Sequence, residues 1–196
     1  MMHAAAGSPF AARISADSSA LDWIPADVSV LVIASDGSFS ELPGRPAGEQ
    51  LADGSSLRAA IARQWRSLPP CWRFLWIAPV HGSWHRVSVL RHRADSALVT
   101  ERRMDPFRGL TRREVDVLHL VADGKTNAEI AQLLWVSTST VSKHVEHLLQ
   151  KLGTRSRVGL ASTAIREGLH LLESPGLPHY SVTEQPLGLP RPDLDT

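Results

Sequence analysis

Apolar residues recur with two different periods along this chain, and the change of period divides the chain into two parts. Between residues 22 and 104 they form short runs or alternate with polar residues, which is typical of strands. Between residues 110 and 161 they recur every three or four positions, which is the period of amphipathic helices. The pattern therefore predicts an α+β chain in which a small antiparallel sheet precedes a helical domain.

The first part is predicted to contain five strands and one helix. Residues 28–34 (VSVLVIA) are nearly all apolar and β-branched, as expected for a strand buried on both faces. A serine, Ser55 or Ser56, then caps a helix that runs to about Trp65. The order of elements predicts one antiparallel sheet with a single helical crossover. The predicted strands are 28–34, 39–42, 72–80, 84–91 and 97–104, and residues 43–54 are predicted to be a loop.

The second part carries three helix-start signals in succession. Thr111 and Glu114 have the spacing of a capping box, in which each side chain binds the backbone N–H of the other residue. Thr126 and Glu129 repeat this box, and Ser137 is placed to cap a third helix. Three short helices with these starts predict a helix-turn-helix.

Glycines and one tryptophan mark the helix ends. Gly124 and Gly153 are placed to end the first and third helices, because glycine adopts left-handed conformations without strain. Trp135 occupies the turn between the second and third helices, where most helix-turn-helix proteins have glycine. A bulky residue is strained in a tight left-handed turn. We therefore predict a looser turn, with the indole packed at the edge of the domain.

The outward face of the third helix is polar and built from short side chains near its start. Hydroxyls of this size let a helix enter the major groove, where Lys, Glu and His reach base edges. The free N–H groups at the helix start favour phosphate. The face therefore predicts double-stranded DNA as the partner. Its residues are Thr138, Ser139, Ser142, Lys143, Glu146, His147 and Gln150, whereas His144 is expected to pack inward.

These motifs resemble the LuxR/NarL-type helix-turn-helix family of bacterial transcription regulators. The resemblance covers roughly residues 106–170 and implies four helices, of which the third reads the major groove and the fourth contributes to a dimer interface. The motifs are LTRRE (110–114), Gly124…Asn127…Glu129-Ile130-Ala131, Ser137…Thr140-Val141…His144-Val145, and Lys151-Leu152-Gly153…Arg155-Ser156-Arg157.

The resemblance also implies which residues bind DNA. Ser142, Lys143 and Glu146 fall at base-contacting positions, and Lys151 and Arg155 fall at backbone-contacting ones. Glu146 stands where a lysine is common, so it should prefer a cytosine amino group or a water-mediated contact. The predicted DNA-binding residues, with the motif itself running from Asn127 to Glu146, are Thr126, Asn127, Ser137, Thr138, Thr140, Ser142, Lys143, Glu146, His147, Lys151 and Arg155.

A homodimer is expected through the fourth helix, from Ser156 to about Glu167. Gly159, Thr163 and Ala164 are small enough there to let two copies approach closely. A two-fold dimer would read inverted half-sites about one helical turn apart.

Composition and charge fit a cytoplasmic DNA-binding protein. Residues 108–160 hold eight Lys/Arg against five Asp/Glu, whereas residues 1–107 hold 11 against 10. This local excess suits a polyanionic partner. The single cysteine, Cys71, allows no intrachain disulfide. No apolar run is long enough to cross a bilayer and no apolar signal segment starts the chain, so we expect neither membrane contact nor secretion.

The resulting domain prediction has five segments. Residues 1–21 form a disordered arm, 22–104 a small sensor-like domain, 105–109 a linker, 110–173 the helix-turn-helix domain and 174–196 a disordered, proline-rich tail.

The strand and helix order of residues 22–104 resembles a reduced PAS- or GAF-like sensor. A phosphate receiver is excluded, because it needs an acidic pair, a later phosphoacceptor Asp and a Lys, and residues 1–107 contain no lysine. We expect this part to bind a small molecule or a protein partner and to bias the DNA-binding domain.

Other classes of protein fit less well. A sigma-factor region would need a helical domain upstream, and an enzyme would need a nucleophile–base set or paired carboxylates. We therefore expect a non-enzymatic protein with no cofactor and no metal site. His81 and His85 are four residues apart but lie across a turn and a strand start. An interaction protein that has lost DNA binding stays open, because Glu146 and the modest basic excess both favour it.

Overall fold

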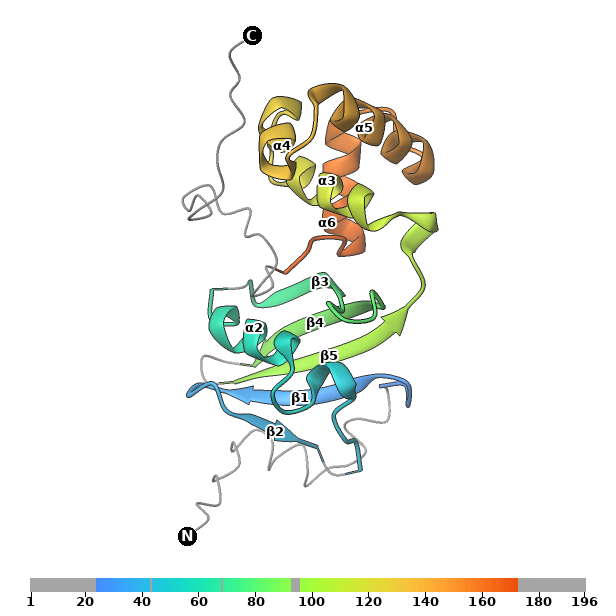
Figure 1. The fold of residues 1–196 in the computed structure, drawn as a ribbon. Helices are drawn as coiled ribbons and strands as arrows, with labels where there is room; N and C mark the ends of the chain where they lie inside the picture. The colour runs from blue at the N-terminus through green and yellow to red at the C-terminus, as the bar shows by residue number, and fades with distance from the viewer. Residues whose placement is uncertain (1–23, 43, 68, 93–95, 173–196) are drawn as a thin grey trace.

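The structure is a computed structural model that describes residues 24–42, 44–67, 69–92 and 96–172. The predicted arm and tail, residues 1–21 and 174–196, lie outside the described residues. An antiparallel sheet forms the first half of the molecule, and helices form the second half (Figure 1). The strands are β1 (Ser29–Ala34), β2 (Phe39–Glu41), β3 (Cys71–Ile77), β4 (Trp84–His92) and β5 (Ser96–Met104), and their order in the sheet is β2-β1-β5-β4-β3.

The predicted sheet and its helical crossover are confirmed. Helix α2 (Ser56–Gln64) connects β2 to β3, and the Ser55 side chain caps it by accepting a hydrogen bond from the Arg58 N–H. The predicted loop before it contains one turn of 3₁₀ helix, η2 (Glu49–Leu51), whose Leu51 side chain is fully buried. The sequence around η2 does not predict this turn, because the turn depends on packing of Leu51 in the core of the sheet.

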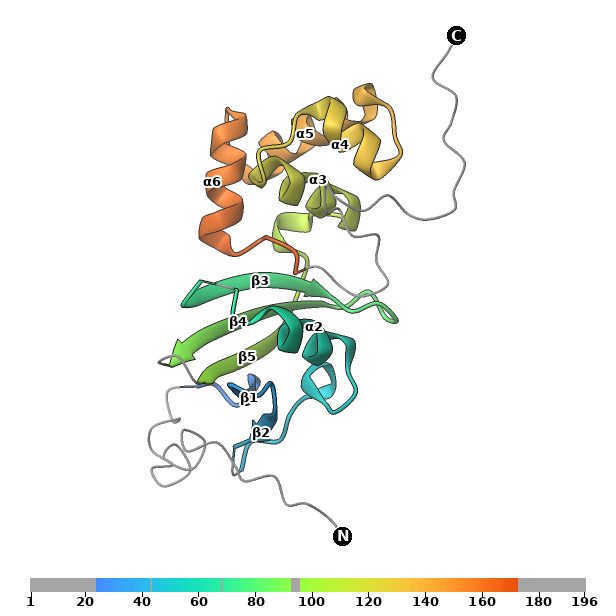
Figure 2. The same ribbon diagram turned by 90° about the vertical axis from the view of Figure 1, so that its left-hand side faces the viewer.

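The two faces of the sheet have different cores. On one face, Phe74 and Trp76 pack with α2, as the alternation of the strand predicts. On the opposite face, Leu75, Ile77 and Trp84 belong to the core of the helical domain. Alternate residues of β3 therefore belong to two cores, and the helices α3 to α6 lie next to this strand, at the end of the sheet away from β2 (Figure 2).

The helical domain has the four predicted helices. They are α3 (Arg112–Ala122), α4 (Asn127–Leu134), α5 (Thr138–Leu152) and α6 (Arg157–Glu167), and a 3₁₀ turn, η3 (Phe107–Gly109), lies within the predicted linker. Both predicted capping boxes are present, at Thr111 with Glu114 and at Thr126 with Glu129. Ser137 caps α5 as predicted. Among the described residues, no helix is both long enough and apolar enough to span a membrane.

The prediction of a loose turn at Trp135 is wrong. Trp135 ends α4 with φ 55° and ψ 47°, which is the left-handed region that glycine favours. Its side chain is 57% exposed, so the indole is largely in solvent. A non-glycine residue pays about 1–2 kcal/mol for this conformation. The hydrogen bond from the Val136 N–H to the Ala131 carbonyl, at 3.0 Å, keeps the turn tight.

The chain returns to the sheet after α6. Gly168 ends α6 in a left-handed conformation, and a Cβ there would lie 2.9 Å from the Arg73 Cβ. Beyond it, the Leu75 N–H donates to the His170 carbonyl at 2.6 Å, and Leu171 pairs with Leu75 in a parallel bridge. Leu172 packs in the core beneath α2. Residues 169–172 therefore attach the end of the helical domain to β3.

Candidate nucleic-acid interface

The predicted recognition face of α5 is turned outward. Thr138, Lys143, Glu146 and His147 are exposed, and Ser142 is half-buried. The opposite face of the same helix lies in the core, where Val141 and Leu148 are fully buried and Leu152 is 4% exposed. The helix therefore presents short polar side chains to solvent at its start and longer ones further along.

The start of α5 holds a cluster of hydroxyls. The Ser137 Oγ accepts from the Thr140 N–H at 3.1 Å and lies 2.8 Å from the Oγ atoms of both Ser139 and Thr140. This cap satisfies one N–H group of the first helical turn. The end of the helix therefore keeps the positive potential that attracts a phosphate.

Asn127 connects three helices. Its Nδ2 donates to the Ser142 Oγ at 3.2 Å, and its Oδ1 accepts from Arg157 at 3.0 Å. Arg157 also donates to the Lys125 carbonyl, just before α4. These contacts join the starts of α4 and α6 to the recognition face of α5. Arg157 appeared in the sequence motifs but not among the predicted site residues, because contacts across 30 residues leave no periodic signal.

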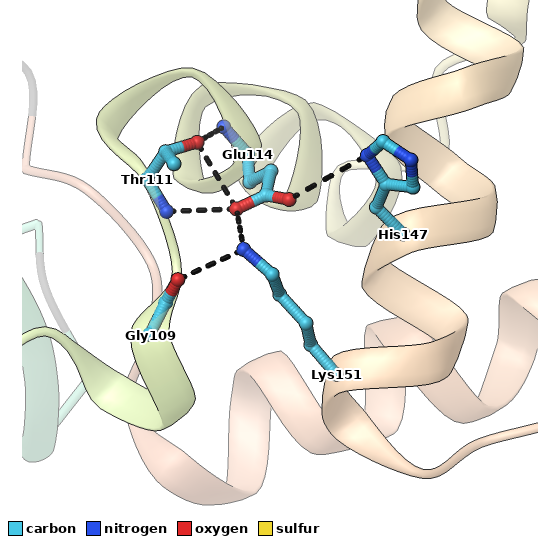
Figure 3. Close-up of polar contacts among 5 residues, drawn as sticks. All are labelled: Gly109, Thr111, Glu114, His147 and Lys151. Carbon is cyan, nitrogen blue, oxygen red and sulfur yellow. Dashed lines mark hydrogen bonds and ion pairs between the residues drawn. The ribbon is translucent and has the colours of Figure 1, made fainter.

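Lys151 reaches back to the start of α3 instead of pointing into solvent (Figure 3). Its Nζ lies 2.7 Å from the Glu114 carboxylate and 2.8 Å from the Gly109 carbonyl. The same carboxylate accepts from the Thr111 N–H at 2.7 Å, and its second oxygen lies 4.0 Å from the Nδ1 of His147. The capping box of α3 is thus also the contact that positions the second half of α5.

Burial raises the pKa of Glu114, but the hydrogen bonds from Lys151 and Thr111 outweigh it, so the pKa lies below its ordinary value of 4.5. Glu114 is therefore charged at neutral pH, which keeps the ammonium of Lys151 engaged. A contact between Lys151 and a DNA phosphate stays a prediction, and the phosphate would have to compete for the ammonium with the Glu114 carboxylate and the Gly109 carbonyl. Arg155, by contrast, is exposed beyond the end of α5.

The residues predicted for dimerisation do not share one exposed surface. Ala164 is fully buried and Thr163 is 6% exposed, both against the chain's own core, so a second copy does not reach them here. Gly159 is half-buried. The exposed apolar residues of α6 are Val158 (78%) and Ile165 (62%), which are two turns apart and so share one side of the helix. The sequence signal that could have found them is this seven-residue spacing of β-branched residues.

The two histidines considered as metal ligands, His81 and His85, lie in different surroundings. His85 is buried between β4 and β5, where its Nδ1 lies 2.6 Å from Glu101 and its Nε2 lies 2.8 Å from the Ser83 Oγ. This order of groups is that of a serine–histidine–acid set. His85 and Glu101 are only 6% and 5% exposed, so the pair joins the two strands inside the sheet. His81 and Cys71 are exposed.

Two short helices joined by a tight turn, with the second one polar and exposed, define a helix-turn-helix module. Residues 108–164 match the family model of the bacterial regulatory proteins of the luxR family. This part of the chain is therefore a LuxR-family helix-turn-helix domain, as its motifs predict.

Curated relatives match over the same region. The oxygen regulatory protein NreC of Staphylococcus carnosus is 45% identical over 65 residues, which are 33% of this chain and 30% of NreC. The nitrate/nitrite response regulator protein NarP of Escherichia coli is 54% identical over 54 residues, or 28% of this chain and 25% of NarP. The chain thus spans less than a third of the length of either relative.

Solved structures match over more of the chain but loosely. The LuxR-type receptor VqmA of Vibrio cholerae is 18% identical with a TM-score of 0.35, covering 80% of this chain and 88% of VqmA. SdiA of Escherichia coli is 17% identical with a TM-score of 0.32, covering 74% of this chain and 84% of SdiA. Scores this low support no conclusion about the sheet.

Proposed function

We propose that this chain is a sequence-specific DNA-binding transcription regulator that binds as a dimer and inserts α5 into the major groove. The exposed polar face of α5, opposite a fully buried one, is the observation that carries the proposal. Because both neighbouring helices contact this face only at its edge, its side chains are free to meet base edges. The relatives named as regulators support the same class, and no catalytic step is assigned to the chain.

The proposed contacts divide by position. Lys143 and Glu146 lie exposed about one turn apart on α5 and are assigned to base edges. Ser142 is assigned to base edges as well, although its hydroxyl also accepts a hydrogen bond from Asn127 of α4. Thr126, Ser137, Thr138, Thr140 and Arg155 are assigned to phosphates, and Asn127 is assigned a second role in fixing the angle between α4 and α5.

Selection of bound sequences from a random duplex pool tests the proposal. We expect enrichment of an inverted repeat with half-sites about one helical turn apart. We also expect affinity for random duplex to fall steeply with salt, because phosphate contacts release counterions. If the chain enriches no sequence and its affinity for random duplex does not depend on salt, the alternative interpretation holds instead, in which the chain is an interaction protein that has lost DNA binding.

The input to this regulator is proposed to act where β4 begins and β5 ends. A cavity of about 460 Å³ is lined there by Trp84, Arg103 and Asp105, among others. Trp84 also belongs to the core of the helical domain, so a molecule in the cavity would contact a side chain that supports α3. A thermal-shift screen of small metabolites and candidate partners tests this role, and a screen without any stabilisation would leave residues 22–104 as a scaffold.

A further inference from the structure

Three potential metal ligands gather where α3 ends and the chain returns to the sheet. His119 and Asp123 are one helical turn apart, and the Nε2 of the imidazole lies 3.6 Å from the Oδ2 of the carboxylate. His170, which follows α6, places its ring edge-on to that of His119, with the ring centroids 5.8 Å apart. One ligand atom from each of the three lies within 4.8 Å of the others.

The imidazole of His170 supplies an independent observation. The residue is only 8% exposed, and its Nε2 is buried with no hydrogen-bond partner among the described residues. Buried polar atoms are nearly always paired, because an unpaired one loses its hydration without compensation. A metal ion bound between the three side chains would supply the missing partner of this nitrogen.

The donor set indicates which class of ion fits. Imidazole nitrogens are borderline donors, and a set of two imidazoles with one carboxylate suits Zn²⁺, Co²⁺ and Ni²⁺ better than Ca²⁺ or Mg²⁺, which bind mainly oxygen. Zinc–ligand bonds of about 2.0–2.1 Å place tetrahedral ligand atoms about 3.3 Å apart. The 3.6 Å between His119 and Asp123 is close to this separation, and the ligand atoms of all three residues lie within 4.8 Å of one another.

The imidazole of His170 also contacts an aromatic side chain. Its ring centroid lies 5.5 Å from that of Trp72, which contributes no charge to the cluster.

We infer that His119, Asp123 and His170 bind one divalent transition-metal ion, with a fourth position left to water. His119 belongs to α3, Asp123 is the residue that ends this helix, and the His170 backbone is hydrogen-bonded to β3. An ion held by all three would therefore fasten the helical domain to the sheet. The effect of that tether on gene regulation rests on the proposed function, whereas the site itself does not.

Titration of the full chain with Co²⁺, followed by its visible absorption, tests the site without DNA. We expect one equivalent to bind with the intense bands of a low-coordinate complex, and Zn²⁺ to displace it. Asp123→Asn and His119→Gln should each weaken binding at least about tenfold, since loss even of outer-shell groups costs that much. His81→Gln removes an exposed imidazole far from the cluster and should leave the affinity unchanged. Equal affinity in all four proteins would overturn the inference.

Thermal unfolding provides a second readout, and it requires no substitution of the buried His170, whose replacement could prevent folding. Zn²⁺ should raise the Tm of the parent chain and of His81→Gln, because a ligand that binds only the folded state stabilises it. The same concentration should leave the Tm of Asp123→Asn almost unchanged. A Tm that does not rise in the parent chain contradicts the site, whatever the outcome of the DNA-binding experiments.

Discussion

At the scale of single residues, Glu114 has the most connected role in the helical domain. It caps α3 through Thr111 and binds Lys151 of α5, although only 4% of its side chain is exposed. A buried carboxylate is tolerated when it is paired and hydrogen-bonded, and removing its charge leaves the partner unmatched.

We expect Glu114→Gln to lower the free energy of unfolding by about 1–3 kcal/mol at pH 7. The pKa of Glu114 is depressed below 4.5 in the folded state, so its charge stabilises the fold fully above that value and stops doing so as pH falls through the folded pKa. The difference between variant and parent should therefore shrink in acid. Urea unfolding at a series of pH values measures it.

Glu129→Gln is the matched control for this prediction. Glu129 forms the same capping box with Thr126, but on the surface and without a lysine. The control should lose less stability than Glu114→Gln. An equal loss in the two variants would show that the Lys151 contact contributes nothing.

Lys143→Ala tests the recognition face at one position. Because Lys143 is exposed at the centre of this face, we expect the change to cost about 1–3 kcal/mol at the selected site and to relax sequence preference. Fluorescence anisotropy with the selected and a scrambled duplex measures both effects. Arg63→Ala removes one charge from an exposed position on α2 and should not change the preference. An unaltered affinity of Lys143→Ala would mean that another face meets the DNA.

At the scale of elements, sequence reasoning succeeded where the cause is local. The capping boxes and the inward stripe of α5 were predictable, because both depend on residues within one or two turns. The return of residues 169–172 to β3 was not predictable, because it depends on a pairing with Leu75 almost one hundred positions away. Trp135 misled the prediction because backbone hydrogen bonds at the end of α4 hold a conformation that the residue type disfavours.

The end of α6 gives an element-scale prediction. Gly168 has φ 63°, and a Cβ there would meet the side chain and backbone of Arg73 at 2.9 and 3.5 Å. Gly168→Ala should therefore lose about 2–4 kcal/mol, from backbone strain and from a displaced β3 contact together. Gly124→Ala shares the positive φ but has open space around it, so it should lose only about 1 kcal/mol. Denaturant unfolding of the two variants separates the cost of backbone strain, which they share, from the cost of the contact with Arg73, which only Gly168→Ala makes.

At the scale of the whole molecule, the burial of α6 leads us to propose a dimer contact on a different side of this helix from the one that the sequence predicts. Two of the small residues that suggested close approach, Thr163 and Ala164, are buried within the single chain. Val158 and Ile165 stay exposed on one side of the same helix, and exposed apolar side chains that share a surface favour an intermolecular contact.

Val158→Glu should weaken the dimer on DNA without lowering the Tm, because this side chain is 78% exposed in the single chain. Sedimentation of the protein–duplex complex gives the stoichiometry. Val80→Glu introduces the same charge at an 83% exposed position in the turn between β3 and β4 and should leave two copies bound. If Val158→Glu still binds as two copies with parent affinity, α6 does not form the interface.

The order β2-β1-β5-β4-β3 makes β3 an outermost strand, and the four residues after Gly168 lie along it. An outermost strand offers unpaired N–H and C=O groups to any other chain that can extend the sheet. The carbonyl of His170 occupies one of these groups, the Leu75 N–H. Residues 169–172 therefore also protect this edge of the sheet against pairing with other chains, so cutting the chain at residue 168 should leave a sheet that aggregates.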